Sequence, residues 1–476
     1  FFESNFFDKS EPDLLSANYL SSYNHLLDSC NSDQWGLFGA NNINVKNAWD
    51  LTTGNGIIVS VIDNGIELTH PDLYHNILTL SYDAKQRTNQ TSIYGNTASH
   101  TYSHGTNCAG IISAENNGYG VIGIAYDSKL LSVCSPSDFV SLQIRALADG
   151  ICWSYLNGAD VINCSWYSNK SDYIRDAINS ATTLGRDGLG SIVVVAAGNQ
   201  EGKIHFPAIC ENTIAVGAID ERATRVSVSW QSCYGEELDI VAPGINIPTT
   251  DITGTLGLNN GIFTSEYSDV DYTNRFDGTS AACPHVSGVA VLILSANPNL
   301  TMPQVREIIS RSARKIEEDT YMYRENDGIH NYGSWNEEVG YGLVDAYKSV
   351  VKAKYYDCYN YEPFIFSNDI NVTTTVNEDA FGYGDIIIKT GVIVTLQSTL
   401  FLAPNTRIII EPGAELIIDG GVITSACSGF WEGIYVVGDK SLPQTMTNQG
   451  SIIMSNGAVI ENARCAIHTW AENDYN

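Results

Sequence analysis

The stretch that indicates the fold is Ile57-Ile58-Val59-Ser60-Val61-Ile62-Asp63-Asn64-Gly65, an apolar run that ends in a carboxylate and a glycine. Such a short aliphatic run is typical of a parallel strand that is buried on both faces. Asp63 would then lie at the carboxyl end of the strand, where open α/β sheets place their sites. Helical segments at 140–156 and 173–183 alternate with further apolar runs, so we expect a doubly wound, mostly parallel α/β sheet.

Two further segments contain residues that can act together with Asp63. His104 lies in Ser103-His104-Gly105-Thr106, and Ser280 lies in Gly278-Thr279-Ser280-Ala281-Ala282. A serine hydroxyl attacks well only when a nearby base removes its proton, and histidine has a suitable pKa for this task. A carboxylate must orient the imidazole and stabilise its charged form. The segments therefore predict Ser280 as nucleophile, His104 as base and Asp63 as the orienting group.

The segment around Ser280 also offers donors for a developing oxyanion. The apolar stretch 286–296 predicts a long buried helix, so Ser280 lies at a helix N-terminus with free N–H groups. A second run, 193–197, predicts a buried strand that is followed by Gly198 and Asn199. The Asn199 carboxamide is the candidate second donor, and loss of such a donor costs about 10²–10³ in turnover.

The order of these residues along the chain is more specific than any one of them. A single aspartate, histidine or serine beside glycine is most often a turn residue. The order Asp63, His104, Ser280 differs from the chymotrypsin and α/β-hydrolase orders and agrees with that of subtilisin.

Several stretches resemble a known family. From Gln34-Trp35-Gly36 to Val339-Gly340-Tyr341-Gly342-Leu343-Val344-Asp345-Ala346 the chain resembles the subtilase family of serine peptidases. The stretches Asn44-Val45-Lys46-Asn47-Ala48-Trp49 and His70-Pro71-Asp72-Leu73 resemble its kexin/furin branch. The resemblance implies a subtilisin-like catalytic domain over residues 30–354 that hydrolyses peptide bonds through an acyl-enzyme.

The resemblance also implies where substrate binds. Two segments of a subtilase form walls that pair with the substrate backbone as an extra strand. The matching residues here are Ser165, Trp166, Tyr167, Ala196, Ala197 and Gly198.

The wall sequences argue against the specificity of the kexin/furin branch. Members of that branch cut after paired basic residues because carboxylates line their pockets. Here Ser165-Trp166 is followed by Tyr167-Ser168-Asn169-Lys170, which adds a cation, and His205-Phe206-Pro207-Ala208 resembles broad-specificity subtilisins. We expect broad cleavage, not restricted to arginine or lysine at P1, the residue before the scissile bond.

Resemblance to the strong subtilase calcium site implies a structural Ca²⁺. Calcium takes six to eight oxygens from carboxylates, amides and backbone carbonyls. The matching ligands are the side chains of Gln34, Asp72 and Asn117 with the carbonyls of Glu115, Tyr119 and Val121. The alternative interpretation of this loop is a plain Asn-Gly turn.

The overall composition fits a secreted enzyme. A formal net charge of −29 and a pI near 4.5 argue against electrostatic binding to nucleic acid or anionic membranes. No stretch approaches the ~18 apolar residues of a transmembrane helix, so we expect no transmembrane segment. Eleven cysteines leave at least one unpaired in the chain. Cys108 and Cys283 are expected to be buried thiols, whereas others can form the disulfides of an oxidising compartment.

The two ends of the chain differ from the catalytic region. Residues 1–14 resemble the last strand of an inhibitory pro-segment, so residues 1–29 are expected to be the remainder of that segment, which would be the enzyme's own inhibitor and would be cut between about 15 and 32. The alternative is an ordinary N-terminal arm. A signal peptide and most of the pro-segment would have preceded residue 1.

Residues 355–476 show short apolar triplets that are centred eight residues apart, among them 392–394, 400–402, 408–410 and 416–418. Regular short strands separated by turn signals favour a β-solenoid over the jelly roll of a kexin-type P domain. The region resembles β-helix modules of large secreted bacterial proteins, so we expect a secreted or cell-surface bacterial protein whose chain continues past 476.

Two functions follow from these observations. The first is a secreted serine endopeptidase that acts on proteins or peptides. The second is an adhesive protein with a latent protease domain, in which the β-rich module binds a surface ligand.

Overall fold

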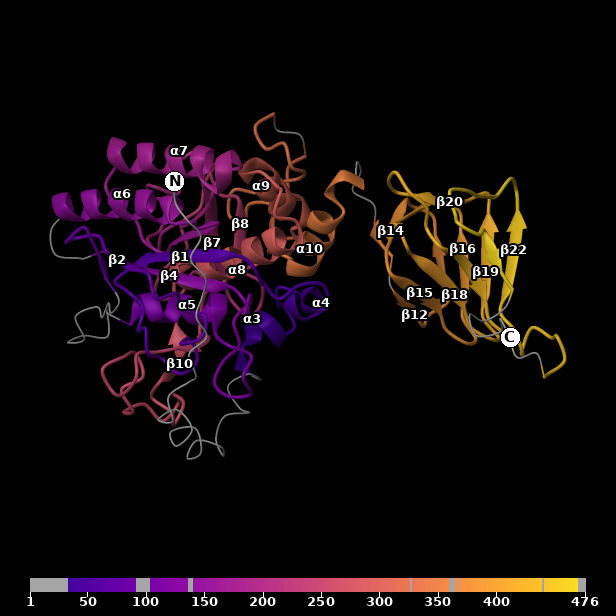
Figure 1. Ribbon diagram of the computed structural model, residues 1–476, viewed down its shortest axis with the longest axis horizontal. Helices are drawn as coiled ribbons and strands as arrows, with labels where there is room; N and C mark the ends of the chain where they lie inside the picture. The colour runs from indigo at the N-terminus through magenta and orange to yellow at the C-terminus, as the bar shows by residue number, and fades with distance from the viewer. Residues whose placement is uncertain are drawn as a thin grey trace, which may run out of the picture. The chain divides into compact units, whose positions relative to one another are not determined.

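The computed structural model describes residues 33–90, 103–135, 140–325, 328–358, 364–366, 368–438 and 441–469 (Figure 1). The chain divides into two compact units, and the division falls between Ala353 and Lys354. The expected pro-segment and its cleavage site lie outside the described residues.

The first unit is built on one eight-stranded sheet with the order β3-β2-β4-β1-β5-β6-β7-β8. All neighbours in it run parallel except β2 and β3. The expected doubly wound, mostly parallel sheet is therefore confirmed. Its strands are β1 (Ile58–Asp63), β2 (Ser81–Asp83), β3 (Thr88–Gln90), β4 (Lys129–Cys134), β5 (Val161–Cys164), β6 (Ile192–Ala196), β7 (Ile214–Ile219) and β8 (Ile240–Pro243).

Helices cover both faces of this sheet (Figure 1). On one face lie α6 (Val140–Leu156) and α7 (Asp172–Leu184), which match the two segments expected to be helical. On the other face, α5 (His104–Ser113) packs beside α8 (Thr279–Ala296), and α8 contacts strands β5 to β8. The remaining elements of this unit are α3 (Trp35–Phe38), α4 (Val45–Trp49), η2 (Arg186–Gly188), α9 (Met302–Ser312), α10 (Ala346–Lys354) and the antiparallel pair β9 (Ile247–Thr250) and β10 (Tyr272–Phe276).

Strand register brings the site residues to one edge of the sheet. Val61 of β1 pairs with Asn163 of β5, and Cys164 of β5 pairs with Val195 of β6. Because these strands run in the same direction, the residues that follow them emerge side by side. Asp63, the last residue of β1, lies at this edge.

The expectation that no stretch approaches the length of a membrane span was wrong for one helix of the described residues, since α8 is long and apolar enough by length and composition. Most of it is buried inside the first unit, where it packs on the sheet and on α5. A buried core helix passes the same test as a membrane span, so this finding is weak evidence for a span.

The second unit is a stack of coils with three parallel sheets, as the spacing of the triplets predicts. Asp385 pairs with Arg407 and Ile393 with Glu415, each 22 residues further along the chain. This parallel pairing is that of a β-helix and excludes a jelly roll for the described coils. The strands are β11 (Phe364–Ile365), β12 (Asp369–Ile370), β13 (Thr374–Val376), β14 (Ala380–Gly382), β15 (Asp385–Ile388), β16 (Ile393–Leu396), β17 (Thr399–Leu402), β18 (Arg407–Ile410), β19 (Glu415–Asp419), β20 (Val422–Ser425), β21 (Gly433–Val436), β22 (Ser451–Ser455), β23 (Val459–Ile460) and β24 (Ile467–His468).

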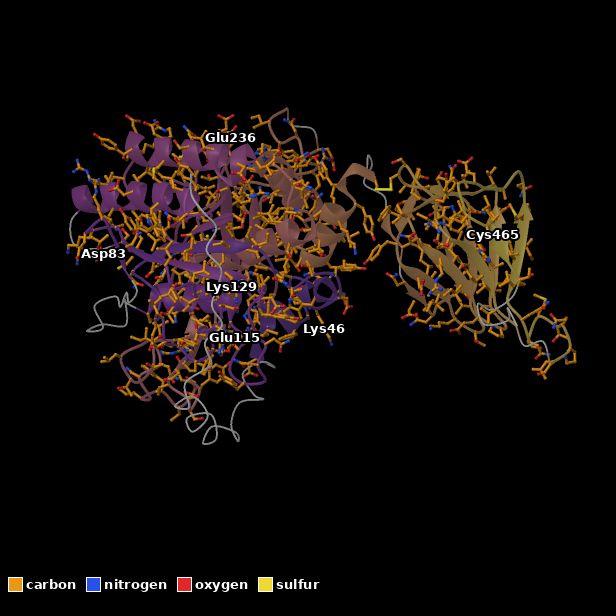
Figure 2. All side chains as sticks on the ribbon, in the orientation of Figure 1. Lys46, Asp83, Glu115, Lys129, Glu236 and Cys465 are labelled. Atoms are coloured by element: carbon orange, nitrogen blue, oxygen red, sulfur yellow. A yellow bond between two sulfur atoms is a disulfide. The ribbon has the colours of Figure 1, made fainter. Side chains whose placement is uncertain are left out.

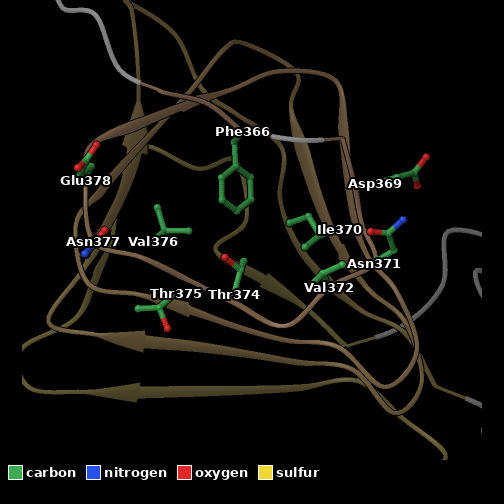
Figure 3. Close-up of a pocket in the computed structure, with 10 residues that line it drawn as sticks. All are labelled: Phe366, Asp369, Ile370, Asn371, Val372, Thr374, Thr375, Val376, Asn377 and Glu378. Carbon is green, nitrogen blue, oxygen red and sulfur yellow. The ribbon is translucent and has the colours of Figure 1, made fainter. Parts of the chain in front are cut away.

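Alternating burial along the strands explains the stack. In β18, Ile408 and Ile410 are buried, whereas Arg407 lies at the surface and pairs with Asp385 on the coil before it. The inner aliphatic residues of successive coils form one continuous core. The first described coil leaves a cavity of about 480 Å³, lined by Phe366, Ile370 and other residues of the same coil (Figure 3).

The cysteines of the described residues are either disulfide-bonded or free. A disulfide joins Cys358, in the short helix η3 (Tyr356–Cys358), to Cys427, which follows β20 (Figure 2). Cys108 and Cys283 are free and buried, which confirms the expectation for these two thiols.

Loss of the disulfide is expected to destabilise the β-module. In the chain-entropy model, a bridge that spans 69 residues stabilises the folded state by about 4 kcal/mol. We expect Cys427→Ser to lower the unfolding midpoint of this module in calorimetry under oxidising conditions. Cys465→Ser, which removes a free thiol from the same module (Figure 2), is the control and should leave the midpoint unchanged. Equal midpoints for both variants and the parent would contradict the prediction.

Candidate active site

The carboxylate of Asp63 and the imidazole of His104 form the centre of the site. His104 Nδ1 lies 2.8 Å from one carboxylate oxygen of Asp63 and 3.0 Å from the other. The Asn64 N–H also donates to the carboxylate at 2.8 Å. With its Nδ1–H donated to Asp63, the imidazole keeps Nε2 free to accept a proton. This is the arrangement that the order of the motifs predicts.

A close backbone approach explains the glycine after His104. The Gly105 N–H donates to the Asn64 side-chain oxygen at 3.0 Å. A Cβ atom at Gly105 would lie 2.2 Å from the carbonyl oxygen of Gly65 and 3.0 Å from the Cβ of Asp63. Only glycine lets α5 come this close to the loop after β1, and that distance sets the contact between His104 and Asp63.

The surroundings of His104 favour its protonated form. Burial of the imidazole opposes protonation, but the negative charge of Asp63 and the hydrogen bond to it outweigh burial. The pKa of His104 is therefore raised well above its usual value of about 6.5. The Cys108 sulfur lies 4.0 Å from His104 Nδ1. A raised pKa makes His104 a stronger base, which is active only at higher pH.

Ser280 lies in the first turn of α8 and is tied to one wall of the cleft. Its hydroxyl donates to the Ser165 carbonyl at 3.1 Å, and the Ser165 hydroxyl donates to the Ser280 carbonyl at 3.0 Å. Ser280 and His104 line the same cleft, which has a volume of about 470 Å³. The structure thus brings the three predicted catalytic residues together, although they are far apart in the sequence.

The side chain of Asn199 is oriented by Thr279, a residue that the sequence analysis did not single out. The Oδ1 atom of Asn199 accepts hydrogen bonds from the Thr279 N–H and hydroxyl, both at 2.8 Å. Because the oxygen is occupied, the amino group of Asn199 is the part left to donate to another group. Asn199 and Thr279 both line the cleft. Thr279 directly precedes Ser280 in the sequence. This position beside the predicted nucleophile was the signal by which the sequence could have indicated Thr279.

Five of the six predicted wall residues line the cleft. Ser165, Trp166 and Tyr167 follow β5, while Ala196 and Gly198 lie at the end of β6. Ala197 does not line the cleft, so the expectation that it is a wall residue was wrong. It is fully buried, its N–H donates to Val216, and its carbonyl accepts from His205. Alternation along an extended segment turns this side chain away from its two neighbours. The other lining residues are Asn64, Ser135, Gln143 and Leu147, which the sequence analysis did not identify.

The six residues expected to hold calcium also meet in space. Asp72 is completely buried, and its carboxylate accepts hydrogen bonds from Asn117 at 3.0 Å and from the Val121 N–H at 3.1 Å. The Gln34 carboxamide forms hydrogen bonds with both backbone groups of the adjacent Ile122. Burial raises the pKa of Asp72 well above its usual range, and the two hydrogen bonds only partly offset this effect. No cationic side chain pairs with Asp72 among the described residues.

Comparison with known proteins identifies the family. The model of the subtilase family matches residues 54–342. The chain belongs to the subtilase family. It is 35% identical over 276 residues to a subtilisin of Bacillus pumilus, and the match covers 56% of this subtilase and 88% of that protein.

Other relatives extend the comparison. This subtilase is 34% identical to the calcium-dependent proteases of Trichormus variabilis and of a Nostoc species, over 64% of its own chain. It spans about half the length of these two relatives, since the match covers 48% of each. Among solved structures, a protease of Pseudoalteromonas arctica is 28% identical with a TM-score of 0.53, and the match covers 68% of this chain and 98% of that one.

The raised pKa of His104 predicts the pH dependence of activity. A protonated His104 cannot accept the serine proton, so kcat/KM should fall as pH drops through a pKa above about 6.5. Asp63→Asn removes the charge that raises this pKa, so the acidic limb should move to lower pH. The same substitution should lower kcat by about 10⁴. The measurement is kcat/KM against pH for both proteins, and an unshifted limb in the variant would contradict the assignment.

Proposed function

We propose that this subtilase is a secreted serine endopeptidase that cleaves proteins or peptides with broad specificity. The observation that carries the proposal is the pair of contacts from His104 Nδ1 to Asp63, in the cleft that also contains Ser280. The family supports the same reaction class. The disulfide in the β-module supports an oxidising compartment and therefore secretion.

The reaction follows from the positions of these side chains. Ser280 Oγ attacks the scissile carbonyl carbon while His104 Nε2 takes the hydroxyl proton, and Asp63 stabilises the resulting imidazolium. The amino group of Asn199 and the N–H groups at the start of α8 donate to the oxyanion. His104 then gives its proton to the leaving amine, which leaves an acyl group on Ser280. Water attacks this ester by the reverse sequence and restores the enzyme.

The charge of the cleft supports broad rather than dibasic specificity. Asp63 is the only acidic residue that lines the described cleft, and it is already bonded to His104. A basic P1 side chain would therefore find no free carboxylate among the lining residues. The backbone of the walls is suited to an extended peptide, which joins as an added strand.

We further propose that the Asp72 site holds a structural calcium ion. A buried carboxylate without a cationic partner is costly, and a divalent cation offsets that cost. The carbonyls of Glu115, Tyr119 and Val121 accept no hydrogen bond from any described residue, although Val121 is buried. These oxygens, with those of Gln34, Asp72 and Asn117, are the hard donors that calcium prefers.

The decisive test of the proposed activity is covalent labelling of Ser280. We expect a fluorophosphonate probe to add one adduct to the full chain, or to the chain after removal of its N-terminal segment, as seen by intact mass. Ser280→Ala should take up no probe, whereas Ser287→Ala, another serine on α8, keeps the nucleophile and is the control. If the wild-type protein takes up no probe in either form, the protease assignment is wrong and the β-module becomes the candidate binder.

Removal of calcium is expected to destabilise the catalytic unit. A ligand present at 100 times its Kd stabilises the folded state by about 2.7 kcal/mol, so EDTA should lower the melting temperature by several degrees. Asp72→Asn should lower the melting temperature and remove its response to EDTA. Asp172→Asn, at an exposed carboxylate, should respond like the parent. An unchanged melting temperature in EDTA, with no calcium detected by elemental analysis, would exclude the site.

A further inference from the structure

Tyr272 has a buried hydroxyl that neither the proposed reaction nor the proposed calcium ligands explain. It is the first residue of β10, and only 2% of its surface is exposed. Its Oη forms no hydrogen bond of normal geometry with any described residue. Buried polar atoms normally have a partner, so an orphaned hydroxyl of this kind needs a physical reason.

The Tyr272 hydroxyl lies beside the Asp72 carboxylate. A Cβ atom at Gly120 would collide with both Tyr272 Oη and Asp72 Oδ2, so the two oxygens flank one point next to this glycine. Burial raises the pKa of Asp72, and the hydroxyl is among the groups that partly offset this effect. A phenol keeps its proton at neutral pH and can donate to a carboxylate. Donors of this kind commonly hold the carboxylates that bind metals, and loss of one costs about 10–100-fold in metal affinity.

His70 makes a second connection between Asp72 and β10. It is fully buried, and its Nδ1 accepts a hydrogen bond from the Asp72 N–H at 3.1 Å. Nδ1 therefore carries no proton, and the Nε2–H donates to the carbonyl of Asp271, directly before β10, at 3.1 Å. The His70 ring also meets the Tyr272 ring edge to face, with centroids 5.6 Å apart. The position of Asp72 is thus linked to the start of β10.

The other end of β10 contacts the catalytic histidine. Phe276, the last residue of the strand, is buried, and its ring lies 5.3 Å from the His104 ring, centroid to centroid, at 79° between the planes. An edge-to-face contact of this kind is favourable. Tyr272 pairs with Thr250 of β9, whose hydroxyl donates to the Thr106 carbonyl in α5 at 2.8 Å. One strand therefore contacts the Asp72 site at its start and His104 at its end.

We propose that Tyr272 is a positioning residue through which a cation held by Asp72 fixes the orientation of the His104 ring, by way of β10 and Phe276. This inference rests on the proposed protease function and on the proposed calcium site. With a cation present, the Asp72 charge is compensated and its carboxylate can accept from the Tyr272 hydroxyl, which anchors the start of β10. Without a cation, the buried charge is costly and this anchor is lost. Calcium would then act on the base of the reaction as well as on stability.

The first measurement is the Kd for calcium of the active chain, from competition with a chromophoric chelator. Tyr272→Phe keeps the ring and removes the hydroxyl, so it should raise this Kd about tenfold or more. Tyr173→Phe, at an exposed tyrosine on α7, is the matched control and should keep the parent Kd. Phe276→Leu leaves the surroundings of Asp72 intact and should also keep it.

The second measurement is the ¹H NMR signal of the His104 Nδ1 proton, which reports the hydrogen bond to Asp63 without any turnover. In the parent, well below its melting temperature in EDTA, removal of calcium should shift or broaden this signal and lower kcat about tenfold. That loss is smaller than the ~10²-fold cost of a 1 Å misplacement. Tyr272→Phe should show the calcium-free signal at calcium concentrations that still saturate the parent. Phe276→Leu lacks the ring contact, so its signal and kcat should respond little to calcium.

Three results would overturn the inference. They are a Tyr272→Phe variant with the parent Kd, a parent whose His104 signal and kcat are the same with and without calcium, and a Phe276→Leu variant that responds to calcium as the parent does. Failure of the underlying proposals also removes the inference, but it looks different. A parent that takes up no fluorophosphonate is not a protease, and a parent that binds no calcium lacks the site.

Discussion

Parallel pairing of β1, β5 and β6 is the constraint on which the whole site depends. The three strands are neighbours in the sheet and run in one direction, so the segments after them emerge together. Asp63 ends the first strand, one wall follows the second, and the other wall ends the third. A slip of one residue in this register would turn Asp63 to the other face of the sheet and remove it from His104. The buried aliphatic residues of the strands prevent such a slip, so the packing of the core fixes the positions of Asp63 and the two walls.

The N-termini of two helices supply the other two residues of the site. His104 opens α5 and Ser280 lies in the first turn of α8, and these helices pack against each other on one face of the sheet. A glycine beside each of these N-termini allows the helix to approach the edge of the sheet where Asp63 lies. At Gly105 a side chain would collide with the loop after β1, and at Gly278 a backbone φ of +113° favours glycine over other residues. The glycines beside His104 and Ser280 are therefore required by close packing at Gly105 and by backbone conformation at Gly278.

The sequence predicted the parts of the structure that depend on local pattern. The run 57–63 became β1, the segment 140–156 became α6, and the triplets after residue 392 became strands of the β-helix. The meeting of Asp63, His104 and Ser280 in one cleft was also predictable, because their three motifs stand in an order specific to one family. These predictions needed only periodicity and motif order.

Features made by long-range contacts were not predictable. Ala197 lies behind its wall because its backbone is bonded to Val216 and His205, which no local pattern indicates. The role of Thr279 in holding Asn199, and the pairing of Cys358 with Cys427, also depend on residues that meet only in the folded chain. The sequence showed that cysteines were available, but connectivity is a property of the fold.

The disulfide also has a mechanical consequence. Cys358 follows α10, the last helix of the catalytic unit, and a covalent bond links it to Cys427 beyond β20. Tension applied to the chain after Cys427 therefore passes through the sulfur atoms to α10 and bypasses the coils between the two cysteines. Those coils would stay folded under a load that peels away the later ones. In a reducing medium the same pull would unravel the module from either end. The bridge thus makes the resistance of the β-module to force depend on the redox state of its surroundings.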